Sequence, residues 1–271
     1  GSKNNRLYSA RANSIFVEDE IIFNNISITG GVRYERIFLE RKDWGNDLNR
    51  DSTATSIKAA NIKVFIPGIG ISYQLANELQ LFSGIHKGFS PPGPGIDDEE
   101  EVLPEESINF EFGTRYNKGF QTGELVAFYN SYNNLLGEDT QSSGLGSYVQ
   151  FNGGEVLIQG IEFSFGNIYN LNKILMPVTV SYTFTDARFK NNFESDFDPW
   201  GKVYYDDEIP YIPKNMLHAK IGLAKNSFKC FLRFKYSSKV RTVAGKAEFT
   251  NSNSINAMHV ADFVIKYQIN S

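Results

Sequence analysis

"LPEESINFEFGTRY" (residues 103–116) changes character at every second residue. If it is an extended strand, one face carries Ile108, Phe110, Phe112, Thr114 and Tyr116, and the other carries Asn109, Glu111, Gly113 and Arg115. A period of two residues is typical of a β-strand. One face is aromatic enough for a protein core while the other carries full charges, so the pattern leaves open which face lies inside.

The composition favours an all-β protein. The 271 residues include 22 Phe, 14 Tyr and 23 Gly, a mixture that favours strands and tight turns over helices. The formal net charge of −4 gives no basic excess that could neutralise phosphates, so we predict no nucleic-acid partner. The one cysteine, Cys230, excludes an internal disulfide and is predicted to be a small apolar wall residue.

Alternation predicts about eleven strands. They fall near residues 12–23, 25–40, 60–75, 79–90, 106–117, 122–136, 147–166, 174–190, 215–225, 229–242 and 257–268. Several are longer than the ~5–6 residues usual in globular proteins and suit the ~9–11 residues that cross a membrane at a tilt. No run approaches the ~20 apolar residues of a transmembrane helix, which excludes a helical membrane protein.

The connectors alternate between short and long. Short ones lie near residues 24, 77, 119, 170 and 226, and long polar ones at 42–60, 91–105, 137–146, 191–214 and 244–256. This alternation predicts an up-and-down meander with all turns at one end and all loops at the other, the layout of an outer-membrane barrel. A soluble β-sandwich would instead use Greek-key connections.

The two faces of the later strands fit a barrel wall. We predict that Leu217, Ile221, Leu232 and Phe234 face lipid and that Lys220, Arg233 and Lys235 face the lumen. A Lys or Arg on the lipid face near the bilayer midplane would cost about 2–4 kcal/mol. By the same reasoning, the aromatic face of the opening stretch is the outer one.

Several stretches together resemble the barrel domain of TonB-dependent outer-membrane receptors. They are "NSIFVEDEIIFNNISITGGVRYERI" (13–37), "LFSGIHKGFSPPGPG" (81–95), "LPEESINFEFGTRY" (103–116), "LVAFYNSYNNLLG" (125–137), "VQFNGGEVLIQGIEFSF" (149–165), "YTFTDARF" (182–189) and "IPYIPKNMLHAKIGL" (209–223). Their order and spacing over nearly the whole chain are those of the family. "HKGFSPPGPG" (86–95) is most similar to the ferric-citrate receptor subgroup.

The resemblance implies an all-β fold, a transmembrane antiparallel up-and-down β-barrel. Residues 1–271 would form roughly half of a barrel of about 22 strands, because open sheet edges are not tolerated in lipid. The plug domain and the remaining strands would lie outside this chain. A bacterial outer-membrane location follows from the same resemblance.

The function implied is that of a receptor that imports a scarce ligand by energy-coupled plug displacement, with a ferric chelate (ferric citrate or a siderophore) as the expected ligand. Iron would travel as the chelate, so no cofactor is expected, and the expected partners are outer-membrane lipid, the TonB energy-coupling complex and the chelate. The alternatives are a passive diffusion porin, a TonB-dependent receptor for a sugar or cobalamin, and a surface adhesin or soluble β-sandwich protein.

Two sets of residues are candidates for function. Arg33, Glu111, Arg115 and Glu162 would face the lumen, where they either pair along the wall or hold the plug. Near the outer strand ends, the ligand candidates are the cations Arg41, Arg50, Lys87, Arg188, Lys202, Lys239 and Arg241 and the aromatics Trp44, Tyr148, Trp200, Tyr204 and Tyr205.

We expect neither a metal site nor an enzyme. His86, His218 and His259 are scattered over distant strands, and the acidic run at 97–101 lacks the glycine and ligand spacing of a calcium loop. The sequence contains no Gly-rich phosphate loop and no Gly-x-Ser-x-Gly elbow.

Overall fold

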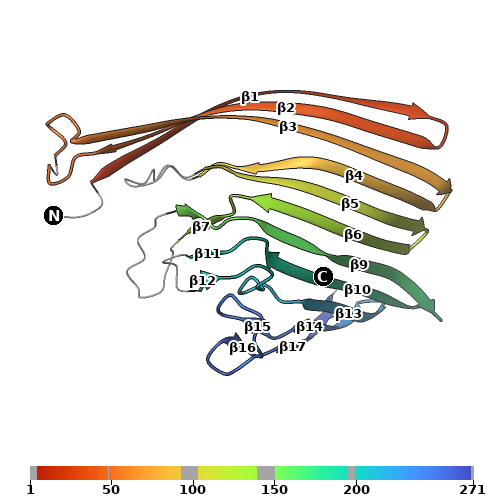
Figure 1. Ribbon diagram of the computed structural model, residues 1–271. Helices are drawn as coiled ribbons and strands as arrows, with labels where there is room; N and C mark the ends of the chain where they lie inside the picture. Colours follow the sequence, from red (N-terminus) through yellow and green to blue (C-terminus); the bar gives the residue numbers. More distant parts are fainter. Residues whose placement is uncertain (1–4, 48, 93–102, 139–149, 195–198, 270–271) are drawn as a thin grey trace.

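The computed structural model describes residues 5–47, 49–92, 103–138, 150–194 and 199–269. Most of these residues belong to one antiparallel sheet of 11 strands, which Figure 1 shows as an open, curved wall. In sheet order its strands are β1 (Arg6–Phe23), β2 (Ile26–Asp43), β3 (Ser56–Ala76), β4 (Leu79–Ser90), β5 (Glu105–Lys118), β6 (Gln121–Asn133), β9 (Val156–Leu171), β10 (Ile174–Phe189), β13 (Asn215–Lys225), β14 (Phe228–Ser237) and β17 (Met258–Tyr267).

The sheet is a meander, and the predicted separation of turns from loops is confirmed. Neighbours in the sheet are also neighbours along the chain, apart from short strands in the long connectors. Those short strands form three two-stranded ribbons, namely β7 (Leu136–Glu138) with β8 (Gln150–Asn152), β11 (Phe193–Glu194) with β12 (Lys202–Val203), and β15 (Val240–Arg241) with β16 (Ser254–Ile255). In Figure 1 the tight turns gather at one end of the sheet and the ribbons at the other.

Four of the tight turns depend on a left-handed residue. Asn24, Asn172 and Asn226 each have φ of 51° and Gly119 has φ of 59° at the first turn position. Asn and Gly tolerate this conformation better than other residues, and a turn of this hand matches the twist of the two strands that it joins. The sequence therefore sets the register at this end of the sheet.

Strand boundaries differ from the predicted ones by four residues or more in β1, β3, β9 and β14. β3 begins at Ser56 and not at residue 60, and β14 ends at Ser237 and not at residue 242. β1 begins at Arg6 and not at residue 12, because its polar first half pairs with β2 as far as Asp43. The predicted strand 147–166 is interrupted after Asn152, where Gly154 has φ of 79°, and β9 resumes at Val156.

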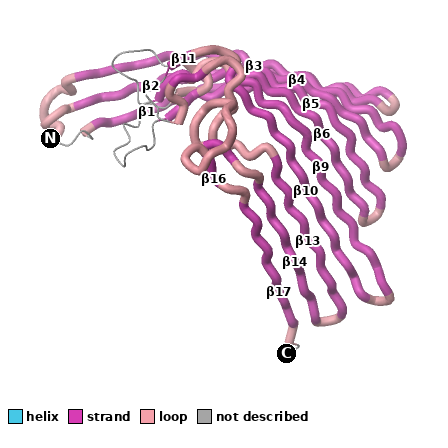
Figure 2. Tube along the Cα trace, turned by 60° about the horizontal axis from the view of Figure 1, so that its bottom comes forward, coloured by secondary structure: helices cyan, strands magenta, loops and turns pink. Residues whose placement is uncertain are grey.

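The two faces of the sheet differ in exposure and crowding. Along β3 the outward residues, such as Phe65 and Ile69, are exposed, and those between them are half-buried or buried. A side chain added at Gly113, Gly160 or Gly222 would collide with an aromatic ring on a neighbouring strand, whereas one added at Gly30 on the opposite face would meet nothing within 4 Å. Side chains converge on the concave side of a curved sheet, so the crowded side is the lumenal face and the other is the outer face; Figure 2 shows the curvature.

The register places charged and apolar residues as predicted. Leu217 lies opposite Tyr236, and Ile221 lies opposite Leu232, on the outer face. Lys220 lies opposite Arg233 on the lumenal face, where its ammonium lies 4.6 Å from the ring centroid of Phe231. No helix among the described residues is long and apolar enough to cross a membrane.

Candidate functional site

Glu111 and Glu162 line a hollow on the lumenal face. Its volume is about 280 Å³, and His86, Asn109 and Asn130 also line it. Glu111 comes from β5 and Glu162 from β9, and Phe128 of β6 packs over Gly160 beside them. Neither carboxylate has an ion-pair partner among the described residues. The wall therefore presents two negative charges to the lumen.

The two lumenal arginines are paired along the wall. Arg33 forms an ion pair with Glu35 on its own strand. Arg115 forms one with Glu124 at 2.6 Å, and its guanidinium also lies 5.1 Å from the ring centroid of Phe82. Of the two roles considered for these residues, pairing along the wall accounts for Arg33 and Arg115 and leaves Glu111 and Glu162 available for another partner.

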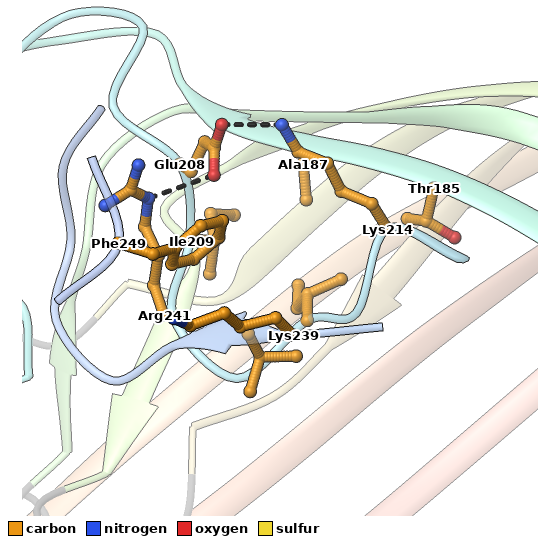
Figure 3. Close-up of a pocket in the computed structure, with 10 residues that line it drawn as sticks. Thr185, Ala187, Glu208, Ile209, Lys214, Lys239, Arg241 and Phe249 are labelled. Atoms are coloured by element: carbon orange, nitrogen blue, oxygen red, sulfur yellow. Dashed lines mark hydrogen bonds and ion pairs between the residues drawn. The ribbon is translucent and has the colours of Figure 1, made fainter. Parts of the chain in front are cut away.

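At the loop end, Glu208 links the long connector that precedes β13 to the long connector that follows β14 (Figure 3). It accepts hydrogen bonds from Lys214 Nζ at 2.6 Å and from Arg241 Nε at 3.0 Å, and Arg188 Nη2 lies 3.7 Å away. Arg241 also lies 4.7 Å from the ring centroid of Phe249, and its side chain is only 6% exposed. Backbone bonds join the same segments, from Glu208 N to Gly245 O at 3.1 Å and from Tyr211 N to Arg241 O at 2.8 Å.

The charges of this group are mutually stabilised. Burial raises the pKa of Glu208, but the hydrogen bonds and positive charges of Lys214 and Arg241 outweigh it, so the pKa lies below its ordinary value. Arg188 Nε donates hydrogen bonds to both carboxylate oxygens of Asp186, at 3.0 and 2.9 Å. Arg188 and Arg241 are thus occupied by the protein's own carboxylates.

An aromatic cluster lies under these loops. Phe189 is fully buried, and its ring contacts those of Phe193 at 5.3 Å and Trp200 at 5.4 Å between centroids. Val156 and Val203 complete the buried cluster. Trp200, one of the predicted ligand contacts, is thereby part of the packing that holds the 190–214 connector on the ends of β9 and β10.

Two tyrosines remain exposed on the same connector. Tyr204 and Tyr205 are 53% and 57% exposed. Lys202 lies 5.9 Å from the ring centroid of Tyr204, and Lys190 lies 5.3 Å from that of Tyr205. This patch brings together three of the predicted ligand residues, together with Lys190, which the sequence reasoning missed because it falls at the end of a predicted strand.

The other predicted ligand residues are dispersed. Arg41 is buried on β2, and Arg50 lies 4.9 Å from the ring centroid of Trp44 in the connector between β2 and β3. Lys87 lies opposite Ile108, on the outer face, and pairs with Glu106 at 2.8 Å. Lys239 lies 5.2 Å from the ring centroid of Phe249. Tyr148 and the acidic run at 97–101 lie outside the described residues.

Sequence reasoning also missed Glu208 and Phe249. Neither carries a periodic signal, since both lie in irregular connectors, and their contacts depend on two connectors meeting in space. Among the described residues, no group of three or more His, Cys, Asp or Glu could hold a metal ion.

A curved antiparallel meander with an apolar outer face, a charged lumenal face and all its long loops at one end defines a transmembrane β-barrel wall. The whole chain, residues 1–271, matches the family described as TonB dependent receptor-like, beta-barrel. The protein therefore belongs to the TonB-dependent receptors of the bacterial outer membrane.

Comparisons with individual proteins agree. The chain is 22% identical over 157 residues to the pesticin receptor of Yersinia enterocolitica, a match that covers 54% of this chain and 20% of that protein. The ferric yersiniabactin uptake receptor FyuA from Yersinia pestis superposes with a TM-score of 0.73 at 14% identity, over 97% of this chain and 39% of that one. The ferric citrate transporter FecA gives 0.73 at 17% identity, over 97% and 38%. This chain thus spans about two fifths of the length of these solved receptors.

Proposed function

We propose that the protein imports an anionic ferric chelate, ferric citrate or a siderophore, by energy-coupled displacement of a plug. The support is the family, together with the similar solved structures, which include a ferric yersiniabactin uptake receptor and a ferric citrate transporter. Residues 1–271 would be a part of the barrel domain, with the plug and the remaining strands supplied by the rest of the protein. The chelate carries the iron as cargo, and the chain needs no cofactor or catalytic group of its own.

The lumenal carboxylates support a plug in the lumen. Glu111 and Glu162 face a hollow without cationic partners among the described residues. Both carboxylates are exposed on the lumenal face, where cations from a plug could pair with them. We assign Glu111 and Glu162 to plug retention, and we assign Arg33 and Arg115 to ion pairs along the wall.

The exposed patch at Tyr204 and Tyr205 is the proposed point of first contact with the chelate. Lys202 provides a positive charge with no ion-pair partner among the described residues, Lys190 shares its charge with Asp206 at 3.3 Å, and the tyrosine rings provide stacking surface. An anionic chelate would gain from both, whereas a neutral or cationic ligand would gain little from the lysines. The patch would depend indirectly on Arg188, Arg241 and Trp200, because these residues hold in place the loops that carry it.

The test is uptake of iron-labelled ferric citrate and ferric siderophores by cells that carry the whole receptor, with and without the energy-coupling system. We expect coupled uptake, reduced by Lys202→Gln and unchanged by Lys229→Gln at the turn end. Undiminished uptake without coupling would favour the porin. Coupled uptake of a sugar or cobalamin, with no ferric chelate transported, would keep the receptor class and refute the ligand.

A further inference from the structure

Three cations form a group on the outer face of β1, β2 and β3. The outer cation cluster consists of Arg11, Arg36 and Lys63. Arg36 lies directly opposite Lys63, and Arg11 lies opposite Phe38, two residues along β2 from Arg36. All three side chains are exposed. The register thus brings three positive charges from three strands onto one small area of the wall.

The protein provides no carboxylate partner for this cluster among the described residues. Arg36 Nε donates a hydrogen bond to Asn61 Oδ1 at 3.2 Å, and its guanidinium lies 4.5 Å from the ring centroid of Phe38. Glu40, the nearest outward carboxylate along β2, pairs with Lys42 at 3.1 Å. Like charges directly opposite one another on a sheet are destabilising. Arg36 opposite Lys63 is therefore an unfavourable arrangement unless an anion lies over it.

The cluster lies at the edge of the apolar band. From Ile15 to Phe23, the outward residues of β1 are apolar apart from Asp19, and they pair with Tyr34 to Ile26 of β2. These eight residue steps extend about 27 Å along the strand. Outer-membrane barrels have an apolar band about 25 Å tall. Arg36 is the next outward position beyond Tyr34 on the loop side, which places the cluster at the level of the lipid headgroups of the outer leaflet.

Other outward cations at this end of the sheet are neutralised within the protein. Lys87 pairs with Glu106, and Arg188 pairs with Asp186 at 2.9 Å. The outer cation cluster differs from them because its two guanidinium groups and one ammonium group still have N–H donors that can bind an anion. Guanidinium groups bind phosphate bidentately, and a lysine adds a compact charge.

We propose that Arg11, Arg36 and Lys63 bind the phosphate of an anionic lipid in the outer leaflet. The phosphate would lie over the facing pair Arg36 and Lys63, with Arg11 at its side, while the lipid's acyl chains lie along the exposed apolar residues Ile15, Tyr34 and Phe65. The aliphatic stems of the three cations follow the apolar surface, and their charged ends reach the headgroup. This site faces lipid, away from the lumen, so it is independent of the imported ligand.

Binding of a phosphorylated lipid A to the whole receptor in detergent, followed by native mass spectrometry, tests the proposal. The comparison lipids are the same molecule without its phosphates and inorganic phosphate alone. Each cation near a membrane surface contributes roughly a fivefold gain in binding of anionic lipid. We therefore expect a loss of about fivefold for Arg36→Gln and on the order of 100-fold for the triple replacement of Arg11, Arg36 and Lys63 by Gln.

The matched control is Lys225→Gln. Lys225 is also an exposed cation, on the face that carries Leu223, but it lies next to the turn at the opposite end of the sheet. It should leave lipid binding unchanged, and heat-modifiable migration in detergent gels verifies that every variant folds. Equal binding by the triple variant, equal binding of the dephosphorylated lipid, or inorganic phosphate bound as tightly as the lipid would each overturn the proposal. A decrease of wild-type binding with increasing salt is also expected, because the contact is between exposed charges.

Discussion

Replacement of Glu208 by Gln should loosen the outer loops without unfolding the barrel. A hydrogen bond to a charged group contributes about 1.5–3 kcal/mol. The Lys214 side chain is 39% exposed, so solvent screening reduces its share to below about 1 kcal/mol, while Arg241, at 6% exposed, keeps the larger value. Gln retains a neutral acceptor for Arg241, which leaves a net loss of about 2 kcal/mol. A free-energy change of this size raises the population of the open loop about 30-fold.

Hydrogen exchange measured by mass spectrometry can detect this opening. The amides of Glu208 and Tyr211 bond across to Gly245 and Arg241, so peptides that contain them report directly on the contact between the two connectors. Exchange in these peptides should accelerate, while peptides from the paired strands stay protected. Glu194→Gln is the matched control, because Glu194 is an exposed carboxylate on the same connector that forms no ion pair with any described residue. Unchanged exchange in Glu208→Gln would refute the role assigned to Glu208, and accelerated exchange across β9 and β10 would mean that it supports the wall itself.

Three further predictions concern the titration of Glu208, the packing around Gly160 and the orientation of Cys230. First, the pKa of Glu208 is lower in the folded protein than its unfolded value of 4.5, so its contribution to loop closure is complete above pH 4.5 and is lost as the pH falls through the folded pKa. Hydrogen exchange, corrected for intrinsic rates, should therefore stay constant from pH 7 to 5 and rise below pH 4.5 in the wild type only. Second, Gly160→Ala would place a methyl group 2.7 Å from Phe128 Cζ and against Phe184 O, and it should destabilise the barrel by about 1–3 kcal/mol. Gly30→Ala, which has open space on the outer face, should be tolerated, and thermal unfolding in detergent compares the two variants. Third, Cys230 lies opposite Leu223 and Ile265 on the outer face, so a lipid-soluble maleimide should label it and a charged impermeant one should not; the reverse pattern would invert the assignment of the faces.

The wall could be predicted from the sequence because its signal is local. Each strand must alternate between lipid and lumen, so the period of two residues in "LPEESINFEFGTRY" already specifies which side of β5 carries Phe110 and which carries Glu111. The turns are equally local, since Asn24 and Gly119 supply the left-handed conformation at the residue where it is needed. Strand ends were predicted less well. β1 begins as early as Arg6, because polar sequence pairs as well as apolar sequence does, and the predicted strand 147–166 is interrupted at Gly154.

The loop end could not be predicted in the same way, because its contacts join residues far apart in the sequence. Arg241 is 33 positions from Glu208, and nothing in the sequence around either residue indicates that they meet. Charge alone makes Arg188 and Arg241 candidates for ligand binding, whereas in the structure both pair with carboxylates of the protein. The exposed patch of Tyr204 and Tyr205 differs because no carboxylate among the described residues pairs with Lys202, the lysine beside Tyr204.

The contrast between the two ends has a physical cause that bears on function. At the turn end, two-residue connectors leave the backbone no freedom, so a residue there is selected for its φ angle and not for what it could bind. At the loop end, the connectors are long enough to fold on their own cluster around Phe189 and to be fastened by Glu208. Loop length costs little closure entropy, so residues beyond this fastening can vary while the barrel stays intact. The ligand can therefore change between members of one family without change in the wall, and recognition must be tested at the exposed patch of this protein rather than inferred from its fold.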